Sequence, residues 1–492
     1  MSGEVSYAYD YSAELPKGWS AVPMGEIATI VAGVGFPKDL QGQKEGNIPV
    51  FKVGDISKAW RSGHIRLVTS PNYLTEEEVS SIKAKLLPAA TTVFAKIGEA
   101  LKLNRRAMLG CPSIIDNNVM GLIPAKDVVH PYYLFYFMRT VDLGALSRAT
   151  AVPSVRKTDV QDILVPLAPI DQQKRIVAEI EKQFSRLDEG IDNLKRVQAN
   201  LKRYKAAVLR AAVEGRLVET EAEIARREGR DFETGEQLLQ RILQERRRRW
   251  EEAELAKMQA KGKPPKNDKW KQKYKEPAAP DTTNLPELPE GWVWATVGAL
   301  GDVIGGLTKN PKRLKMDKKY PYLRVANIYA NELRLDEIEE IGVEDGELEK
   351  LLVRKGDLLI VEGNGSPDQI GRLAIWDGSI TPCVHQNHLI KVRLYSGCSS
   401  YWALNWMMSP EGRRYVRDVS SSTSGLYTLS VGKTSRLPTP LPPRTEQHRI
   451  VTKIDRRLSI LRETEAQVEA NLQRAERLRQ SLLAQAFAGA LP

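Results

Sequence analysis

One fifteen-residue phrase occurs twice in this chain of 492 residues. Residues 166–180 read PLAPIDQQKRIVAEI, residues 440–454 read PLPPRTEQHRIVTKI, and eight of the fifteen positions are identical. A second phrase repeats in nearly the same register, because LPKGW at 15–19 returns as LPEGW at 288–292. Self-similarity at a fixed spacing indicates repeated structural units. The chain therefore contains two copies of one unit, each headed by one phrase and closed by the other.

Between these phrases the two copies share a frame but differ in their inserts. Gly25 and Gly33 correspond to Gly298 and Gly306, and IPVFKVGDI at 48–56 corresponds to YPYLRVANI at 320–328. In contrast, the first copy has AKIGEALKLNRRAML where the second has VEGNGSPDQIGRLAI. A constant frame that carries unlike inserts suits two domains that share a fold and bind different features.

The first part of each copy, 15–166 and 288–440, is predicted to be a mixed α/β domain. Short β-branched and aromatic runs are cut by glycine, proline and asparagine, which is typical of strands joined by turns. We predict strands at VFKVGDI, GDLLIVEG and LIKVRLY, and helices at PYYLFYFMRTV and SYWALNWMMS.

The second part of each copy is predicted to be a long helix, beginning near Asp171 and Thr445, which are acceptable N-caps. Apolar residues recur with a 3.5-residue period, the pattern of a coiled-coil seam. The first seam is Val177, Ile180, Phe184, Leu187, Ile191, Leu194, Gln198, Leu201, Lys205, Val208 and Ala212. The second is Val451, Ile454, Leu458, Leu461, Glu465, Val468, Leu472, Ala475, Arg479, Leu482 and Ala486.

These patterns predict an α+β protein in which two mixed α/β domains are separated by a long antiparallel coiled coil and related by a pseudo-two-fold axis. Two unrelated amphipathic helices on separate domains are the alternative. The predicted parts are a first domain at 1–165, a helix at 166–215, a charged helix and basic linker at 216–285, a second domain at 286–439 and a helix at 440–492.

Positive charge is concentrated in the segment between the first helix and the second domain. The chain carries a net charge of +11, and residues 241–275 hold 13 Lys and Arg against 5 Asp and Glu. Such a run is either a solvated linker face or a surface that contacts phosphates. The sequence alone leaves both interpretations open.

Common catalytic and metal-binding patterns do not fit this sequence. Gly432-Lys433-Thr434 ends like a phosphate-binding loop, but position 427 is Tyr where that loop requires Gly. CVHQNH at 383–388 has no second ligand cluster, and three scattered cysteines do not make a disulfide framework. No run of 18 apolar residues and no signal-peptide core is found, so we expect a soluble, cytoplasmic protein.

Two LPxGW-headed variable domains, each closed by a PLxP…Q…RIV phrase and a long helix, resemble the specificity subunit of type I restriction-modification systems. The resemblance extends from Leu15 to Pro492. It implies a host-defence complex in which this chain reads a split sequence in double-stranded DNA with two target-recognition domains. Its helices would dock two modification subunits, which bind S-adenosylmethionine and methylate adenine, and restriction subunits, which use ATP and Mg²⁺. The chain itself would hold no cofactor, no metal and no catalytic group.

Basic and amide side chains of the inserts are the DNA-contact candidates, because they can bond base edges or phosphates. They are Lys96, Asn104, Arg105, Arg106, Arg156, Lys157, Lys309, Arg313, Asn364, Gln369, Arg372 and Lys433. The helix-pairing and partner candidates are Val177, Ile180, Phe184, Leu187, Ile191, Val451, Ile454, Leu458, Leu461 and Val468. Two other functions stay open: a stand-alone regulator that binds a bipartite DNA site, and a coiled-coil adaptor whose domains bind proteins.

Overall fold

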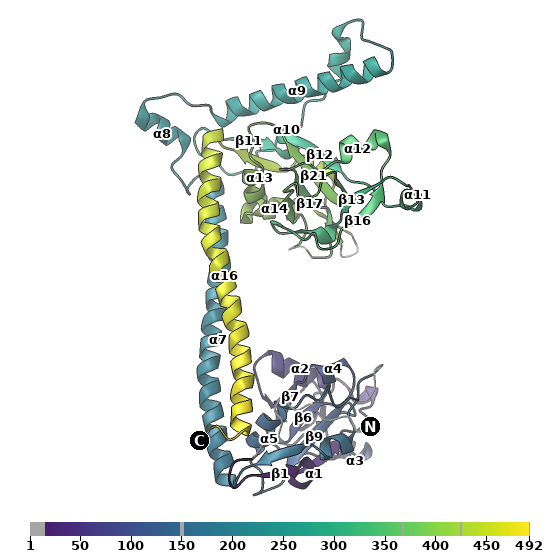
Figure 1. Cartoon of the computed structure of the whole chain (residues 1–492), viewed down its shortest axis with the longest axis vertical. Helices are drawn as coiled ribbons and strands as arrows, with labels where there is room; N and C mark the ends of the chain where they lie inside the picture. The colour runs from purple at the N-terminus through teal and green to yellow at the C-terminus, as the bar shows by residue number, and fades with distance from the viewer. Residues whose placement is uncertain (1–14, 148–151, 367–368, 424–425, 492) are drawn as a thin grey trace. The chain divides into compact units, whose positions relative to one another are not determined.

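The computed structural model describes residues 15–147, 152–366, 369–423 and 426–491 (Figure 1). The chain divides into two compact units, one comprising Met1–Val197 with Gln467–Pro492 and the other Gln198–Ala466. The boundaries between the units cut through both long helices, α7 (Ile170–Val213) and α16 (Arg444–Phe487). Each unit therefore holds one mixed domain and a part of each long helix.

The first domain is built on a five-stranded sheet of order β2-β9-β6-β7-β4, a three-stranded sheet β5-β3-β8 and a β1–β10 ribbon. Neighbouring strands are antiparallel except in the pairs β4–β7 and β3–β8. The strands are β1 Ser20–Pro23, β2 Ala28–Ala32, β3 Ile48–Phe51, β4 Arg66–Leu67, β5 Tyr73–Leu74, β6 Thr92–Ala95, β7 Arg106–Leu109, β8 Ile114–Ile115, β9 Val119–Pro124 and β10 Leu164–Leu167. The helices are α1 Met24–Ile27, α2 Val53–Arg61, α3 Glu76–Ser81, α4 Glu99–Lys102, α5 Pro131–Met138 and α6 Lys157–Gln161.

The second domain repeats this arrangement, with a sheet of order β12-β21-β17-β19, a sheet β16-β13-β20 and a β11–β24 ribbon. The strands are β11 Val293–Thr296, β12 Gly301–Gly305, β13 Lys319–Leu323, β14 Ile328–Tyr329, β15 Glu332–Leu333, β16 Glu339–Gly342, β17 Leu358–Val361, β18 Gly363–Asn364, β19 Leu373–Ile375, β20 Val384–His385, β21 Leu389–Leu394, β22 Ser421–Thr423, β23 Leu426–Thr428 and β24 Pro438–Leu441. The helices are α10 Val297–Leu300, α11 Pro311–Leu314, α12 Asp345–Leu351, α13 Ser400–Met408, α14 Pro410–Val419 and α15 Val431–Ser435. Strands β13 and β20 are parallel, as β3 and β8 are in the first domain.

The repeated glycines mark one place where two stretches of backbone touch in each domain. A Cβ on Gly33 would lie 1.9 Å from the carbonyl oxygen of Asp116, and one on Gly306 would lie 2.1 Å from that of Gln386. Any side chain would therefore collide with the segment that follows the parallel strand β8 or β20. Glycine recurs at this position in both copies because only a residue without a side chain allows the two backbones to approach so closely.

Most of the predicted elements are confirmed, and one strand is wrong in part. GDLLIVEG and LIKVRLY contain β17 and β21, and the two aromatic helices are α5 and α13. In VFKVGDI, however, the strand ends at Phe51 and α2 begins at Val53. The carboxylate of Asp55 accepts a hydrogen bond from the backbone N–H of Lys52 across 2.8 Å, and this cap starts a helix within a β-branched run.

The two long helices follow the predicted seam. Each is 44 residues long and begins within one residue of the predicted N-cap. All eleven seam positions of each helix are buried or half-buried, and most residues between them are exposed. A heptad of apolar side chains is buried when it packs against another helix of the same period.

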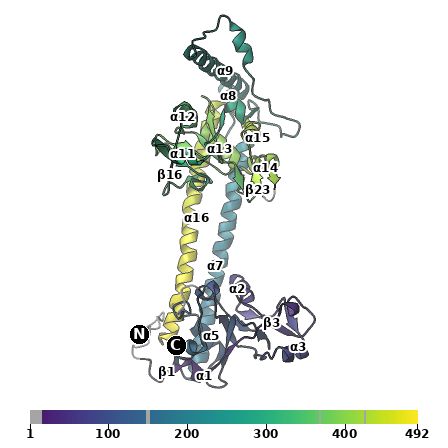
Figure 2. The ribbon, with the colours of Figure 1, turned by 90° about the vertical axis from the view of Figure 1, so that its right-hand side faces the viewer.

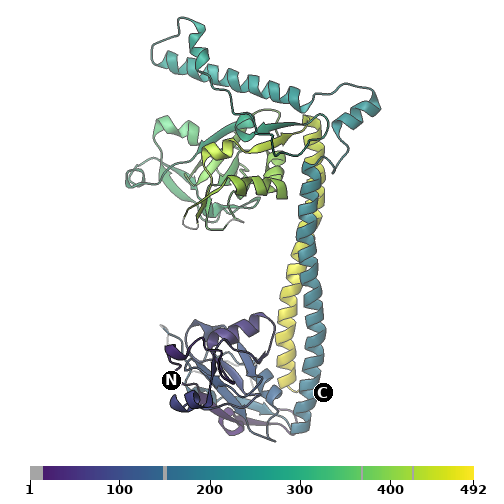
Figure 3. The same ribbon diagram turned by 180° about the vertical axis from the view of Figure 1, so that it is seen from behind.

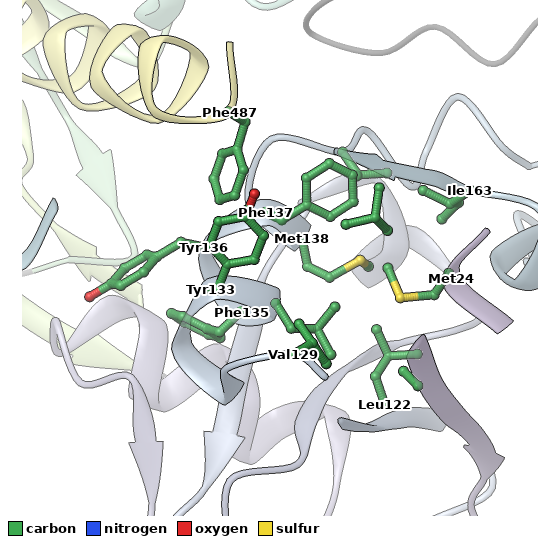
Figure 4. Close-up of a cluster of buried hydrophobic side chains, with 14 of the residues drawn as sticks. Met24, Leu122, Val129, Tyr133, Phe135, Tyr136, Phe137, Met138, Ile163 and Phe487 are labelled. Carbon is green, nitrogen blue, oxygen red and sulfur yellow. The ribbon is translucent and has the colours of Figure 1, made fainter. Parts of the chain in front are cut away.

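The pairing of the helices is antiparallel within each unit. In the first unit, Ile180 and Phe184 of α7 share a core with Leu483 and Phe487 near the end of α16. Figure 2 shows α5 beside the start of α7, and Figure 4 shows the ring of Phe487 directed at the aromatic side chains of α5. The centroid of the Phe487 ring lies 5.0 Å from that of Tyr133, with the rings edge to face.

In the second unit, the opposite ends of the same helices pack together. Val208 and Ala212 near the end of α7 share a core with Ile450 and Ile454 near the start of α16. Each domain is therefore seated on the beginning of its own long helix and on the end of the helix from the other copy.

The basic segment is folded and belongs to the second unit. Helices α8 (Glu221–Glu228) and α9 (Gly235–Ala260) precede a short 3₁₀ helix at Asp268–Lys273. Leu238 and Ile242 of α9 are fully buried against Ala295, Leu300 and Leu441 of the second domain. Figure 3 shows α9 and its return segment projecting from that domain. The sequence predicted this charged helix, but it did not predict that the helix packs against the second domain.

Candidate nucleic-acid interface

The two repeated phrases meet in space and fix each domain to its helix. In the first unit, Nε1 of Trp19 donates a hydrogen bond to Oε1 of Gln172 across 3.1 Å. In the second, Nε1 of Trp292 donates to Oε1 of Glu446 across 3.0 Å. Both bonds join the tryptophan of LPxGW to the first turn of a long helix, so the two phrases repeat together because they form one contact.

The identical glutamine of the closing phrase makes a second fixed contact. Gln173 is fully buried; its Oε1 accepts from the backbone N–H of His130, before α5, and its Nε2 donates to the carbonyls of Val128 and Ala168. Three bonds to backbone groups require an amide of this length. A glutamine is therefore retained where its neighbours vary.

Gln447 makes the corresponding bonds in the second copy. Its Oε1 accepts from the N–H of Ser399, before α13, and its Nε2 donates to the carbonyls of Gly397 and Pro442. The repeated residues thus hold the domains in place. They leave the inserts as the parts that can differ in function.

In each domain one pair of neighbouring inserts forms the same backbone platform. In the first, the N–H of Val155 donates to the carbonyl of Lys96 across 2.9 Å, so the loop after β6 lies beside the segment that enters α6. In the second, the N–H of Leu429 donates to the carbonyl of Glu362 across 2.7 Å, after β17 and before α15. We call this pair of segments, 96–98 with 152–157 and 362–366 with 427–433, the loop platform.

The side chains on the loop platform differ between the copies. Lys96, Arg156 and Lys157 of the first copy are replaced at the corresponding places by Glu362, Ser430 and Val431. The first platform also carries two exposed apolar side chains, Ile97 (37% exposed) and Val152 (55%). The sequence search missed these two because it considered only basic and amide residues. Their exposure beside lysine and arginine is the signal that reveals them.

The six DNA-contact candidates of the first copy lie in different environments in the structure. Arg156 and Lys157 are exposed and Lys96 is half-buried, and all three lie on the loop platform. Arg105 is half-buried on the approach to β7. Asn104 has a positive φ of 50° and is bonded internally, its Nδ2 to Asp142 across 2.6 Å. Asn104 therefore shapes a turn.

Arg106 is not available to DNA in this structure. Its side chain is buried in β7 with 1% exposure, and its guanidinium donates to the backbone carbonyls of Asn104 and Val141. Burial lowers the pKa of Arg106 to about 9, because the charged form is poorly solvated there. Asn104 and Arg106 are withdrawn from the DNA-contact set.

The second copy places its candidates in two groups. Asn364 lies in β18, whose backbone pairs with β23, but its side chain lies outside the described part of the structure; Gln369 (exposed) lies next to the same platform and Lys433 (half-buried) lies on it. Lys309 and Arg313 lie apart from it, next to β16, and are paired with carboxylates: Lys309 with Glu339 at 2.7 Å and Arg313 with Glu347 at 2.8 Å. Those pairings make the second group the weaker candidates.

Arg372 is held by an aromatic residue that the sequence search missed. Its guanidinium donates to the carbonyl of Val325 across 3.0 Å and lies 4.9 Å from the ring centroid of Tyr329. Arg334 covers the same ring at 3.8 Å. Both guanidinium groups lie over the same tyrosine ring, and this contact within the domain fixes the position of the Arg372 side chain. We keep it as a candidate because its side chain is only half-buried.

The two long helices expose apolar side chains outside their seam. The seam candidates are buried or half-buried in helix pairing, so a further partner needs other residues. Tyr204 of α7 is 46% exposed, and Leu478, at the corresponding position of α16, is 48% exposed. Ile460 of α16 is 60% exposed. These three side chains are the candidates for contact with a further partner.

Two kinds of feature, clusters of metal ligands and membrane-spanning helices, were looked for in the described parts of the chain. Within them, no three His, Cys, Asp or Glu residues form a group that could hold a metal ion. In CVHQNH, His385 is buried with its Nδ1 3.1 Å from the carbonyl oxygen of Leu351, and Cys383 is buried in a hydrophobic cluster. The described helices include none that is both long and apolar enough to cross a membrane.

Comparison with known proteins agrees with this arrangement. The model of the family "Type I restriction modification DNA specificity domain" matches residues 16–203 and 289–474. The EcoKI specificity subunit of Escherichia coli (strain K12) is 21% identical over 98% of this chain and 90% of its own length. The StySPI specificity subunit of Salmonella potsdam is 22% identical over 97% of this chain and 90% of its own length.

One solved structure supports the fold independently. A chain from a structural study of complex assembly and conformational transition in a type I R-M system superposes with a TM-score of 0.63 at 18% identity, covering 96% of this chain and 98% of that one. With two matching domains that cover most of its length, this chain belongs to the type I restriction-modification DNA specificity family and is a DNA-recognition subunit, not a catalytic one.

Proposed function

We propose that the chain reads a bipartite site in double-stranded DNA, with one domain on each half-site, inside a type I restriction-modification complex. One observation carries this proposal. The loop platform has the same backbone bonds in both domains, yet Lys96, Arg156 and Lys157 of one correspond to Glu362, Ser430 and Val431 of the other. Equal scaffolds with unlike side chains suit the reading of two different sequences.

The composition of the first platform suits both kinds of DNA contact. Lysine and arginine bind phosphates, and arginine also reads guanine through two hydrogen bonds in the major groove. The exposed Ile97 and Val152 can contact a thymine methyl group, which distinguishes thymine from cytosine. At the second platform, Gln369 and Lys433 supply an amide and a basic group, of which the amide can bond adenine at two atoms, and Asn364 stays a candidate by residue type alone.

The chemistry belongs to partner subunits in this proposal. Two modification subunits dock on the outer faces of α7 and α16, one near Tyr204 and one near Leu478, and restriction subunits join them. The modification subunits bind S-adenosylmethionine, and the restriction subunits bind ATP and Mg²⁺. This chain holds the duplex so that a modification subunit can extrude the target adenine, because enzymes that act on a base must remove it from the stack.

Methylome sequencing tests the proposal directly. The host genome is sequenced with and without this gene, and methylated adenines are compared. We expect one bipartite motif, two short specified parts separated by an unspecified gap, to lose methylation when the gene is deleted. An unchanged methylome, with the modification genes expressed, would contradict the proposal.

Two simpler functions give different results. A regulator acting alone would bind its site tightly without modification subunits and leave the methylome unchanged. A coiled-coil adaptor would show no salt-dependent binding to duplex DNA. The exposed basic platform of the first domain favours DNA over the adaptor.

A further inference from the structure

A basic hairpin projects from the second domain, outside the matched family domains. It consists of α9 and the return segment 261–275, and the family model matches residues up to 203 and from 289 onward. Neither the loop platform nor the helix seam uses it.

The start of the hairpin is packed against the second domain. Leu238 and Ile242 of α9 are fully buried in the second domain, and the guanidinium of Arg249 lies 5.3 Å from the ring centroid of Tyr395. Three residues after the return segment ends, the carbonyl of Ala278 accepts a hydrogen bond from the hydroxyl of Thr296 across 2.9 Å. Both ends of the hairpin are thus attached to the same domain.

Aromatic residues fasten the return segment to α9. The ring of Trp250 stacks on that of Trp270 at 6.0 Å and contacts that of Tyr274 at 5.3 Å. Nη1 of Arg246 donates to the Tyr274 hydroxyl across 2.7 Å. The segment after Ala260 therefore returns along α9 in a fixed conformation, which a solvated linker would not need.

The charges of the two arms are arranged differently. On α9, Arg247, Arg249 and Lys257 are each paired with a glutamate of the same helix. The return segment, which the structure describes in full, holds seven lysines and one acidic residue, Asp268. Six of these lysines are exposed and form no ion pair: Lys261, Lys263, Lys266, Lys269, Lys273 and Lys275.

The hairpin surface suits a polyanion better than a protein. Protein interfaces have an apolar or aromatic centre from which lysine is depleted. Among the described residues of the hairpin, no large hydrophobic side chain is exposed, because the aromatic ones pack on one another. Duplex DNA presents one negative charge per ~1.7 Å of its axis, and lysine is a strongly hydrated point charge suited to phosphate.

We propose that the lysines of the return segment bind the phosphate backbone of the DNA that flanks the target, on the side of the half-site read by the second domain. This inference rests on the proposed function, since it needs the second domain to sit on DNA. The contacts add affinity without reading sequence. They would lengthen the stretch of duplex that the chain holds.

The test uses the full chain copurified with its modification subunits and duplexes that carry the methylated motif. Each duplex has either four or twenty base pairs beyond one half-site. The test variant is Lys263→Gln, Lys266→Gln, Lys269→Gln and Lys273→Gln together. The matched control replaces the same four lysines by arginine, which keeps the charge. Binding is measured by fluorescence anisotropy between 50 and 200 mM salt.

We expect the wild type and the arginine control to bind more tightly when the flank beside the second half-site is long. The glutamine variant should lose that advantage and bind the short duplex like the wild type. On the long duplex, its slope of log affinity against log salt should be less steep by about 1 per lysine that contacts a phosphate. Each such contact changes affinity about 3.5-fold over this salt range.

Two results would overturn the inference. One is the same flank dependence in the glutamine variant and the wild type. The other is the loss of a subunit from the purified complex, which would make the hairpin a protein-docking surface. Neither touches the proposed function, because binding of the motif in the short duplex is measured in the same experiment.

Discussion

The indole of Trp292 donates a hydrogen bond to the fully buried carboxylate of Glu446 across 3.0 Å. The other oxygen of that carboxylate accepts from the backbone N–H of Glu221 across 2.9 Å. One side chain thus joins the second domain, α16 and α8. In the first unit Trp19 makes the corresponding bond to Gln172, which is only half-buried.

This difference predicts unequal effects of one substitution. Trp292→Phe leaves the buried oxygen of Glu446 without its donor, and such a loss costs about 1–3 kcal/mol of folding free energy. Trp19→Phe removes a similar volume, but water can reach Gln172 in place of the indole. Urea unfolding followed by circular dichroism should show the larger loss for Trp292→Phe. Equal losses would mean that packing, not the hydrogen bond, determines the effect.

The loop platform and the buried arginine beside it make a second prediction. Lys96→Ala, Arg156→Ala and Lys157→Ala together should abolish specific binding to the motif and change the melting temperature little, because these side chains lie at the surface. Arg106→Ala should instead lower stability by about 2–5 kcal/mol, since the carbonyls of Asn104 and Val141 lose their donor and a cavity remains. Duplex-binding titrations and thermal melts separate the two effects. Retained specific binding in the triple variant would remove this platform from the interface.

The sequence predicts well those features that depend on a regular local spacing of apolar residues. The seam of α7 and α16 needs only the 3.5-residue spacing, so its positions and the helix starts were correct. The doubled phrases likewise predicted the doubled fold. The bonds of Trp19 to Gln172 and of Gln173 to Val128 and His130 could not be predicted, because they join residues far apart in the chain.

The DNA-contact residues were the hardest part to predict. Arg105 and Arg106 are neighbours and look equivalent, yet the register of β7 turns Arg106 into the core while Arg105 stays half-buried. Asn104 needs a left-handed turn that only its bonds to Asp142 and Leu143 reveal. The residue type shows which contacts a side chain can make. Only its position in the folded sheet shows whether that side chain reaches the surface.

A buried lysine in the second domain gives a pH-dependent prediction. Nζ of Lys391 donates to the carbonyls of Lys350 and Leu352 across 2.7 Å each, and burial lowers its pKa from 10.5 to about 8. Between these values the unfolded chain binds more protons than the folded one, so this group makes stability rise with pH from about 8 to 10.5 and fall as pH drops through that window.

Lys391→Met should remove that contribution. The free energy of unfolding of the wild type should therefore rise relative to that of Lys391→Met as pH increases across this range. Lys319→Met, at an exposed position in the same domain, is the matched control and should run parallel to the wild type. Parallel curves for Lys391→Met as well would mean that Lys391 is not held in a desolvated site. Urea titrations at several pH values provide the measurement.

The two domains should be separable readers of DNA. Each has its own sheets and its own loop platform, so replacing residues 20–160 by the matching insert of another specificity subunit should change one half of the methylated motif only. Trp19, Gln172 and Gln173 lie outside the exchanged segment, and the matching insert supplies the backbone groups that replace those of Val128 and His130, so the new domain stays on its helix. Methylome sequencing reads the result. A change in both halves would show that the domains do not read independently.

Tyr204 and Leu478 are exposed at equivalent positions of the two long helices. We therefore predict that substitutions there reduce the number of modification subunits in the complex. Each lies at the same repeat position on a long helix, so each would serve one of two modification subunits. Tyr204→Glu or Leu478→Glu places a charge where an apolar contact would be buried, which opposes docking because the charge must be desolvated. We expect each single variant to lose one modification subunit and the double variant to lose both, as measured by sedimentation of the copurified complex. Gln480→Glu, exposed on the same helix but turned away from Leu478 by about 200° at 3.6 residues per turn, is the control and should retain both subunits. A complete complex in both single variants would place the docking surface elsewhere, with the exposed Ile460 the next position to test.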